Sequence, residues 1–175
     1  MTKPDINAVL MLAAKKGDLA AIKKAVASGA DVKAFYAYGM TLRCLAGTTP
    51  LYLAVEEEHV EAVKLLLEEG ANVNATNEYG ITILDVAASN GSAEIVRLLL
   101  DAKADVDSYA GILPTPLMCA VQKGHTEVVN ILLEAGADVN VSADWGGRNH
   151  TLLTIARKNA HEEIVAILKE HGAKE

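Results

Sequence analysis

Residues 114–140, PTPLMCAVQKGHTEVVNILLEAGADVN, decide the fold of this chain because the same pattern returns along almost its whole length. The pattern opens with a threonine that has three counterparts, and the four lie 33, 33 and 36 residues apart. Ala8, which lies 41 residues before Thr49, occupies the same position in a fifth copy at the N-terminal end. The four threonines are Thr49, Thr82, Thr115 and Thr151. Such a period predicts an array in which each copy forms one small structural unit.

Two columns of identical residues fix the register of the five copies. They are Leu10, Leu51, Leu84, Leu117 and Leu153, and Ala13, Ala54, Ala87, Ala120 and Ala156. In each copy a short apolar segment comes first, and in several copies a glycine such as Gly124 interrupts it. A longer segment then carries apolar residues at helical spacing, as at Val63 and Leu66. Each copy is therefore predicted to form two short antiparallel helices followed by an extended, outward segment.

These residues resemble the ankyrin repeat, whose period of 33 residues and TPLH-x-A, GH, V-x-LL and GADVN motifs they follow over nearly the whole chain. The resemblance implies an all-α ankyrin-repeat solenoid of five helix-turn-helix repeats with β-hairpin-like finger loops. We treat residues 1–175 as a single domain. Its repeats are predicted at about 4–33 (an N-terminal cap), 46–75, 79–108, 112–141 and 148–175 (a C-terminal cap), with an expanded finger at 34–48. With both ends capped, we expect a complete small protein.

The chain departs from the family's pattern at positions that matter for stability. The resemblance implies that a histidine in the first helix ties neighbouring loops together, and no copy keeps it. Its position holds Met11, Tyr52, Asp85, Met118 and Thr154. Lys103 stands where other repeats have the glycine that closes the second helix, and Glu58 replaces a turn glycine. We expect Lys103 to adopt a left-handed conformation at a cost of about 1 kcal/mol.

Composition limits the classes of partner and the cellular compartment. The net charge of −7 is the wrong sign for binding a phosphate backbone or an anionic membrane, so neither nucleic acid nor membrane is expected as a partner. The 51% hydrophobic content excludes a disordered chain. The two cysteines, Cys44 and Cys119, are too few for a disulfide scaffold, and the sequence contains no export signal. We therefore expect a cytoplasmic monomer.

Aromatic residues gather in the predicted fingers. The chain has only seven, of which six lie in fingers and the seventh, Tyr52, begins an inner helix. Since aromatic and arginine side chains supply much of the energy of protein interfaces, we predict a non-enzymatic module that binds another protein through its finger loops and concave inner helices. The predicted protein-binding residues are Phe35, Tyr36, Tyr38, Tyr52, Glu56, Glu57, Tyr79, Tyr109, Gln122, Trp145 and Arg148.

Structural explanations of the same residues stay open. Phe35, Tyr36 and Tyr38 would also be explained by a small core inside the expanded first finger. Glu56 and Glu57, which with Glu58 form an acidic run, would also be explained as the solvated end of a helix.

One loop offers a rival function, because Asp144, Arg148 and His150 bring a carboxylate, a guanidinium and an imidazole close to the predicted helix start at Thr151. The alternative is therefore an anion-binding or catalytic site on the Asp144–His150 loop. This loop lacks a nucleophile with a base beside it, so we predict no enzyme, no cofactor and no metal site.

Three histidines and two asparagines have explanations within the repeat pattern. His59, His125 and His161 recur at one position, where we expect them to open second helices and not to form a catalytic set. Asn74 and Asn140 match finger asparagines that, in the ankyrin family, resemble substrates of an asparaginyl hydroxylase. The simpler interpretation is that asparagine tolerates the backbone of the turn.

Overall fold

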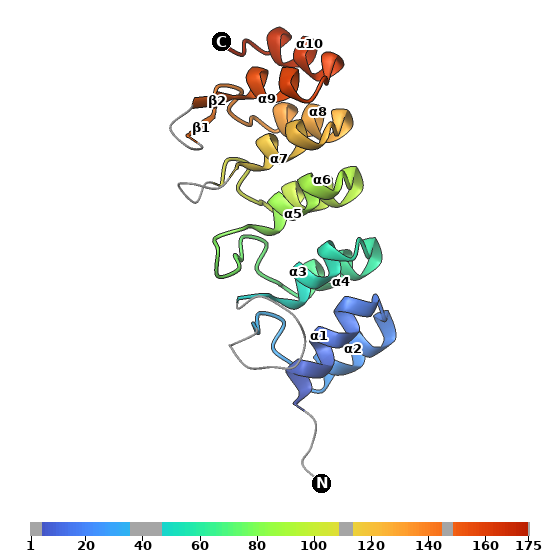
Figure 1. The fold of residues 1–175 in the computed structure, drawn as a ribbon. Helices are drawn as coiled ribbons and strands as arrows, with labels where there is room; N and C mark the ends of the chain where they lie inside the picture. Colours follow the sequence, from blue (N-terminus) through green and yellow to red (C-terminus); the bar gives the residue numbers. More distant parts are fainter. Residues whose placement is uncertain (1–4, 36–46, 109–113, 145–148, 175) are drawn as a thin grey trace. The chain divides into compact units, whose positions relative to one another are not determined.

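The computed structural model of the protein describes residues 5–35, 47–108, 114–144 and 149–174. Within these residues it has ten α-helices and two short β-strands, as the all-α repeat prediction requires (Figure 1). The helices are α1 (Ile6–Lys16), α2 (Leu19–Ala27), α3 (Pro50–Glu56), α4 (Val60–Glu68), α5 (Ile83–Asn90), α6 (Ala93–Asp101), α7 (Pro116–Lys123), α8 (Thr126–Glu134), α9 (Leu152–Lys158) and α10 (Glu162–Glu170). The strands are β1 (Ser142–Asp144) and β2 (Asn149–Thr151). The chain divides into two compact units, Met1–Ile83 and Leu84–Glu175, and each is described by itself.

Side-chain caps decide where the inner helices begin. Three of the four repeated threonines accept a hydrogen bond from a backbone N–H three residues later, as Thr115 does from Met118 at 3.3 Å. Thr49 and Thr151 cap α3 and α9 in the same way. The first repeat differs, because Ala8 cannot cap a helix. Asp5 caps α1 instead, and the helix therefore begins at Ile6, before the position that the repeat pattern marks.

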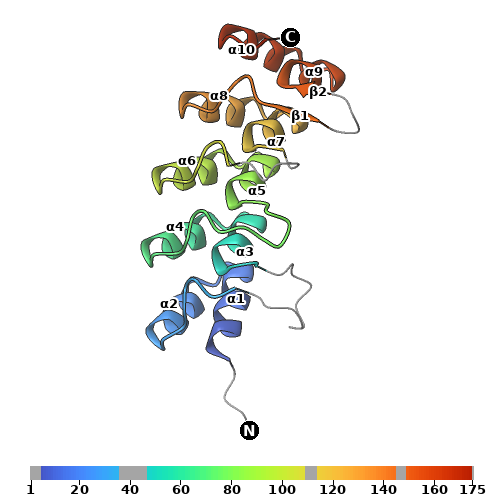
Figure 2. The same cartoon turned by 90° about the vertical axis from the view of Figure 1, so that its left-hand side faces the viewer.

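The first unit is a stack of two helix pairs. α1 packs on α2 and on α3, and α3 packs on α4. In both views, α2 and α4 lie on the same side of α1 and α3 (Figure 2). Leu10, Ile22, Leu51 and Leu66 are fully buried between these helices. Because helices this short are marginal in isolation, the unit depends on burying these aliphatic side chains.

The second unit repeats this arrangement with its own core. α7 packs on α8 and α9, while α8 also contacts α6 and α10. Ile95, Leu99, Leu117 and Leu132 are fully buried there. Ala120 is equally buried in α7, and its small side chain lets neighbouring helices approach closely. An aliphatic core is therefore present in both units.

Among the residues that the structure describes, three other than glycine have left-handed backbones. Lys103 has a φ of 69°, so the prediction that it closes its helix in this conformation is confirmed. Glu58 and Ala160, both at φ 58°, hold the same conformation in the turns between the two helices of a repeat. Each of these positions favours glycine, and each therefore carries backbone strain.

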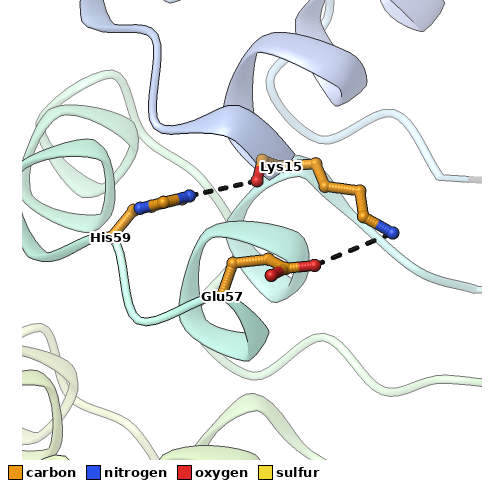
Figure 3. A network of polar contacts seen from close by, with 3 residues as sticks. All are labelled: Lys15, Glu57 and His59. Carbon is orange, nitrogen blue, oxygen red and sulfur yellow. Dashed lines mark hydrogen bonds and ion pairs between the residues drawn. The ribbon is translucent and has the colours of Figure 1, made fainter.

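Histidines tie three of the repeats to the repeat before them. The Nε2–H of His59 donates to the carbonyl oxygen of Lys15 at 3.1 Å (Figure 3), and that of His125 donates to the carbonyl of Ser89 at 3.0 Å. His161 makes the same contact to Gln122 at 3.4 Å. The three residues stand at the N-caps of α4, α8 and α10, as predicted, but their side chains make no capping bond.

This arrangement corrects one expectation from the sequence. The absence of the family's first-helix histidine removes one link between repeats, but the second histidine of the motif supplies another. The ring of His125 lies so close to Gly91 that a Cβ there would be 2.5 Å from its Nδ1 atom. Gly17 and Gly124 face His59 and His161 in the same way. The turn glycines are therefore required by the ring that packs on them as well as by their backbone angles.

The fingers pair as short hairpins where the structure describes them. β1 and β2 are antiparallel, with Ser142 opposite Thr151 and Ala143 opposite His150. In the first unit, Thr76 and Thr82 form a single antiparallel bridge. The prediction of β-hairpin-like fingers is confirmed for these two.

Candidate functional site

Two of the predicted aromatic residues are exposed on the fingers of the first unit. Phe35 is 66% exposed and Tyr79 is 61% exposed, which makes them the most exposed large apolar side chains in the described part of the chain. For Phe35, this exposure argues against the interpretation that its ring is buried in a small core of the first finger. Five other predicted residues lie outside the described residues: Tyr36, Tyr38, Tyr109, Trp145 and Arg148.

Tyr52 belongs to the core and not to an exposed surface. Only 7% of it is exposed, and its hydroxyl oxygen lies 3.4 Å from the Nδ2 of Asn77, which donates to it. Its place at the start of α3 points its ring into the packing between that helix and the next finger. The sequence placed Tyr52 on the correct helix but could not show that the finger would cover it.

Asn77 is a supporting residue that the sequence analysis missed. It is 4% exposed, and its Oδ1 accepts hydrogen bonds from the N–H groups of Tyr79 at 3.0 Å and Ile81 at 3.1 Å. Its own N–H donates to the carbonyl of Ile81 at 3.1 Å. These bonds fix the turn that carries Tyr79, so the exposed ring stands on a preorganised backbone. The signal available in the sequence was an asparagine two residues before Tyr79, since asparagine side chains often bond the backbone two residues further on.

The C-terminal end of α3 is acidic. Glu56 and Glu57 are exposed, and Glu57 forms an ion pair with Lys15 at 3.7 Å (Figure 3). Acidic side chains are unfavourable at a helix C-terminus by about 0.3–1 kcal/mol each, because the dipole is negative there. The helices α1, α7 and α9 instead have lysine or arginine in their last turn. Glu58 follows in the left-handed conformation at φ 58°, which favours glycine.

A hollow of about 430 Å³ lies beside the first finger and is here named the finger hollow. Its lining comes from three segments of the first unit: Lys33 and Phe35, then Gly47 and Thr49, then Asn72, Asn74, Ala75 and Thr76. Gly47 has a φ of 86°, and a Cβ on it would lie 2.8 Å from the carbonyl oxygen of Thr76. Glycine is thus needed where the start of α3 meets the second finger. No sequence motif marked this hollow, because its walls are far apart in the chain.

The second unit holds the remaining predicted residues that are described. Gln122 is exposed at the end of α7, and its carbonyl accepts the bond from His161. Asn140 is exposed, and its Oδ1 accepts a hydrogen bond from the N–H of Lys174 at 3.0 Å, so it links the finger to the end of the chain. His150 lies in β2, while residues 145–148 of the rival site lie outside the described residues. The anion-binding alternative stays a hypothesis.

The described residues offer little reactive chemistry. Burial, with a smaller contribution from the charge of Asp85, raises the pKa of the Cys119 thiol to about 12, so this cysteine is a poor nucleophile. Cys44 lies outside the described residues. No group of three or more His, Cys, Asp or Glu side chains in the described ranges could hold a metal ion. Among the same residues, no helix has the length and apolar character needed to span a membrane.

Pairs of short helices followed by fingers, three of them tied to the preceding pair through one histidine, define a helical repeat protein. A family model described as ankyrin repeats (3 copies) matches residues 10–110 and 112–175, and the chain belongs to this family. A search of curated proteins found no match. Ankyrin repeats are generally protein–protein interaction modules, and the family is typically non-enzymatic.

Proposed function

We propose that this protein binds a partner protein through its finger loops and the exposed ends of its inner helices, and that it catalyses no reaction. The observation that carries the proposal is the exposure of Tyr79 on a turn fixed by Asn77. An aromatic ring held in place loses little conformational entropy when a partner covers it. Burying such a side chain stabilises a complex by about 1.5–3 kcal/mol, which is the size of a typical hot spot.

The acidic end of α3 supports the same proposal. Glu56 and Glu57 are exposed at a helix end where the dipole disfavours negative charge, and Glu57 lies 3.7 Å from Lys15. A partner that brings positive charge to this end would relieve this unfavourable interaction. In the second unit, the residues proposed to bind a partner are Gln122, Tyr109, Trp145 and Arg148. We further propose a cytoplasmic monomer with no role for nucleic acid or membrane, consistent with the net charge of −7.

A capture experiment with matched variants tests this proposal. Wild type, a Phe35→Ala/Tyr79→Ala variant and a Leu12→Ala/Leu19→Ala control are immobilised and exposed to lysate of the source cell, and mass spectrometry identifies the retained proteins. The control removes two other exposed apolar side chains, at 40% and 36% exposure, from the first helix pair of the same unit. We expect at least one lysate protein to be retained by the wild type and by the control, but not by the Phe35→Ala/Tyr79→Ala variant. If all three immobilised proteins have the same helical circular dichroism and retain the same lysate proteins equally, the fingers are not the binding surface.

A further inference from the structure

We infer that Asn90 is a site of spontaneous deamidation, and that the end of α5, together with the ring of His125, holds this reaction back while the protein is folded. In this reaction the backbone nitrogen of Gly91 attacks the side-chain amide carbon of Asn90. Three features of the turn point to it: the sequence, the hydrogen bonds of the Gly91 nitrogen and the packing of His125. This reactivity is independent of the proposed function.

The sequence at this turn favours the reaction. Of the asparagines in the chain, only Asn90 is followed by glycine. Glycine has no Cβ to hinder attack by its own nitrogen, and its backbone rotates more freely than that of any other residue. Asn90 is exposed at the last position of α5, so water can reach its side-chain amide. The pair therefore combines an unhindered nucleophile with access to the water that completes the reaction.

Deamidation at this pair needs only water as a co-reactant. The Gly91 nitrogen loses its proton and bonds to the side-chain carbonyl carbon of Asn90, while the bond between that carbon and the amide nitrogen breaks. The amide nitrogen leaves with the proton as ammonia, and a cyclic succinimide remains. Water then adds to either carbonyl of the ring. The products are aspartate and isoaspartate at position 90, and isoaspartate places one additional carbon in the main chain.

The folded end of α5 opposes the first step. The N–H of Gly91 donates to the carbonyl oxygen of Ala87 at 3.1 Å and to that of Ala88 at 3.3 Å. Ring closure brings the same nitrogen onto the side chain of Asn90, so the peptide between the two residues must rotate out of its helical position. Both hydrogen bonds are then lost. Deamidation therefore requires local opening of the last turn of α5.

His125 holds this turn closed from the following repeat. Its Nε2–H donates to the carbonyl of Ser89 at 3.0 Å, and its ring packs so closely on Gly91 that an added Cβ would lie 2.5 Å from its Nδ1 atom. Because the ring contacts the residues on both sides of Asn90, rotation at Asn90 breaks at least one of these contacts. Isoaspartate lengthens the main chain between Ser89 and Gly91, so its formation weakens the link between the two repeats.

Peptide mapping by mass spectrometry tests the inference on the full chain. The protein is incubated at mildly alkaline pH, either folded or in urea that unfolds it, and chromatography separates the peptides that contain aspartate or isoaspartate at position 90. We expect Asn90 to react about tenfold or more faster in urea than in the folded protein, because opening of the turn no longer limits the reaction. Equal rates in the two states would overturn the protective role of the turn.

Asn159 provides a matched control in the same unit. It follows α9 as Asn90 ends α5, and the next residue, Ala160, has the same left-handed backbone at φ 58°. In urea Asn159 should react several-fold more slowly than Asn90, because the methyl group of Ala160 hinders the attacking nitrogen. A reaction at Asn159 that is as fast as that at Asn90, or no reaction at Asn90 in urea, would overturn the assignment of the site.

Two variants separate local opening of the turn from unfolding of the whole unit. His125→Ala removes the ring and should speed deamidation of the folded protein about fivefold, the factor that one hydrogen bond contributes to the opening equilibrium. Thr115→Ala, which removes the cap at the other end of α7, should speed it much less. The rates are compared at urea concentrations that give both folded variants the same free energy of unfolding. Equal acceleration would show that the reaction follows global unfolding and would refute the role of His125.

Discussion

Replacing Gly91 with alanine tests how a histidine of one repeat packs on the turn of the repeat before it. Gly91 has a φ of 78°, and a Cβ added there would lie 2.5 Å from Nδ1 and 2.8 Å from Cγ of His125. No real Cβ tolerates such contacts, so the ring must move. When it moves, the His125 Nε2–H loses its 3.0 Å hydrogen bond to the carbonyl of Ser89.

The structure sets the expected magnitude. A residue with a Cβ in the left-handed conformation costs about 1 kcal/mol, and loss of the histidine hydrogen bond costs about 1 kcal/mol more. We therefore expect Gly91→Ala to lower the free energy of unfolding by about 2 kcal/mol. Gly136 provides the matched control in the same unit, because its φ is 93° and nothing lies within 4 Å of an added Cβ. Gly136→Ala should cost only the backbone term, about 1 kcal/mol.

Urea unfolding followed by helical circular dichroism measures these differences. A double-mutant cycle adds His125→Ala, which removes the ring that the new methyl group would strike. In that background, Gly91→Ala should cost no more than Gly136→Ala does. Equal costs for Gly91→Ala and Gly136→Ala in the wild-type background would refute the reasoning. So would a Gly91→Ala cost that His125→Ala leaves unchanged.

Three further predictions concern a helix end, a helix start and a thiol. Lys103→Gly should raise the free energy of unfolding by about 0.5–1 kcal/mol, because the φ of 69° suits glycine; an unchanged urea midpoint would contradict this. Thr115→Ala should lower the free energy of unfolding by about 1 kcal/mol, because the α7 cap is lost. Thr115→Ser keeps a capping hydroxyl and should lower it much less in the same assay. Cys119, measured in a Cys44→Ser background, should react slowly with iodoacetamide below pH 10, because its pKa is about 12 when folded. As the pH rises above about 9, the thiol ionises in the unfolded chain before it does in the folded protein, so its contribution should lower the free energy of unfolding. A contribution that raises the free energy of unfolding over this range would refute the prediction.

The candidate site was predictable only in part. Finger position and aromatic character identified Phe35 and Tyr79 from the sequence, and both are exposed. Tyr52 was predicted from its aromatic character and its place at the start of an inner helix, but it is buried, because the following finger covers it and Asn77 bonds to its hydroxyl. Sequence position shows which element carries a side chain. It does not show what another segment, 25 residues away, places on top of it.

The sequence by itself determined the repeat period, the starts of the threonine-capped helices α3, α7 and α9, and the left-handed position of Lys103. These features depend on contacts within about four residues and on the conformations open to a single backbone, so they can be read along one dimension. Only the tertiary structure decided the partners of His125 and the walls of the finger hollow. The imidazole and the carbonyl that it binds are 36 residues apart, and stacking of the repeats brings them together.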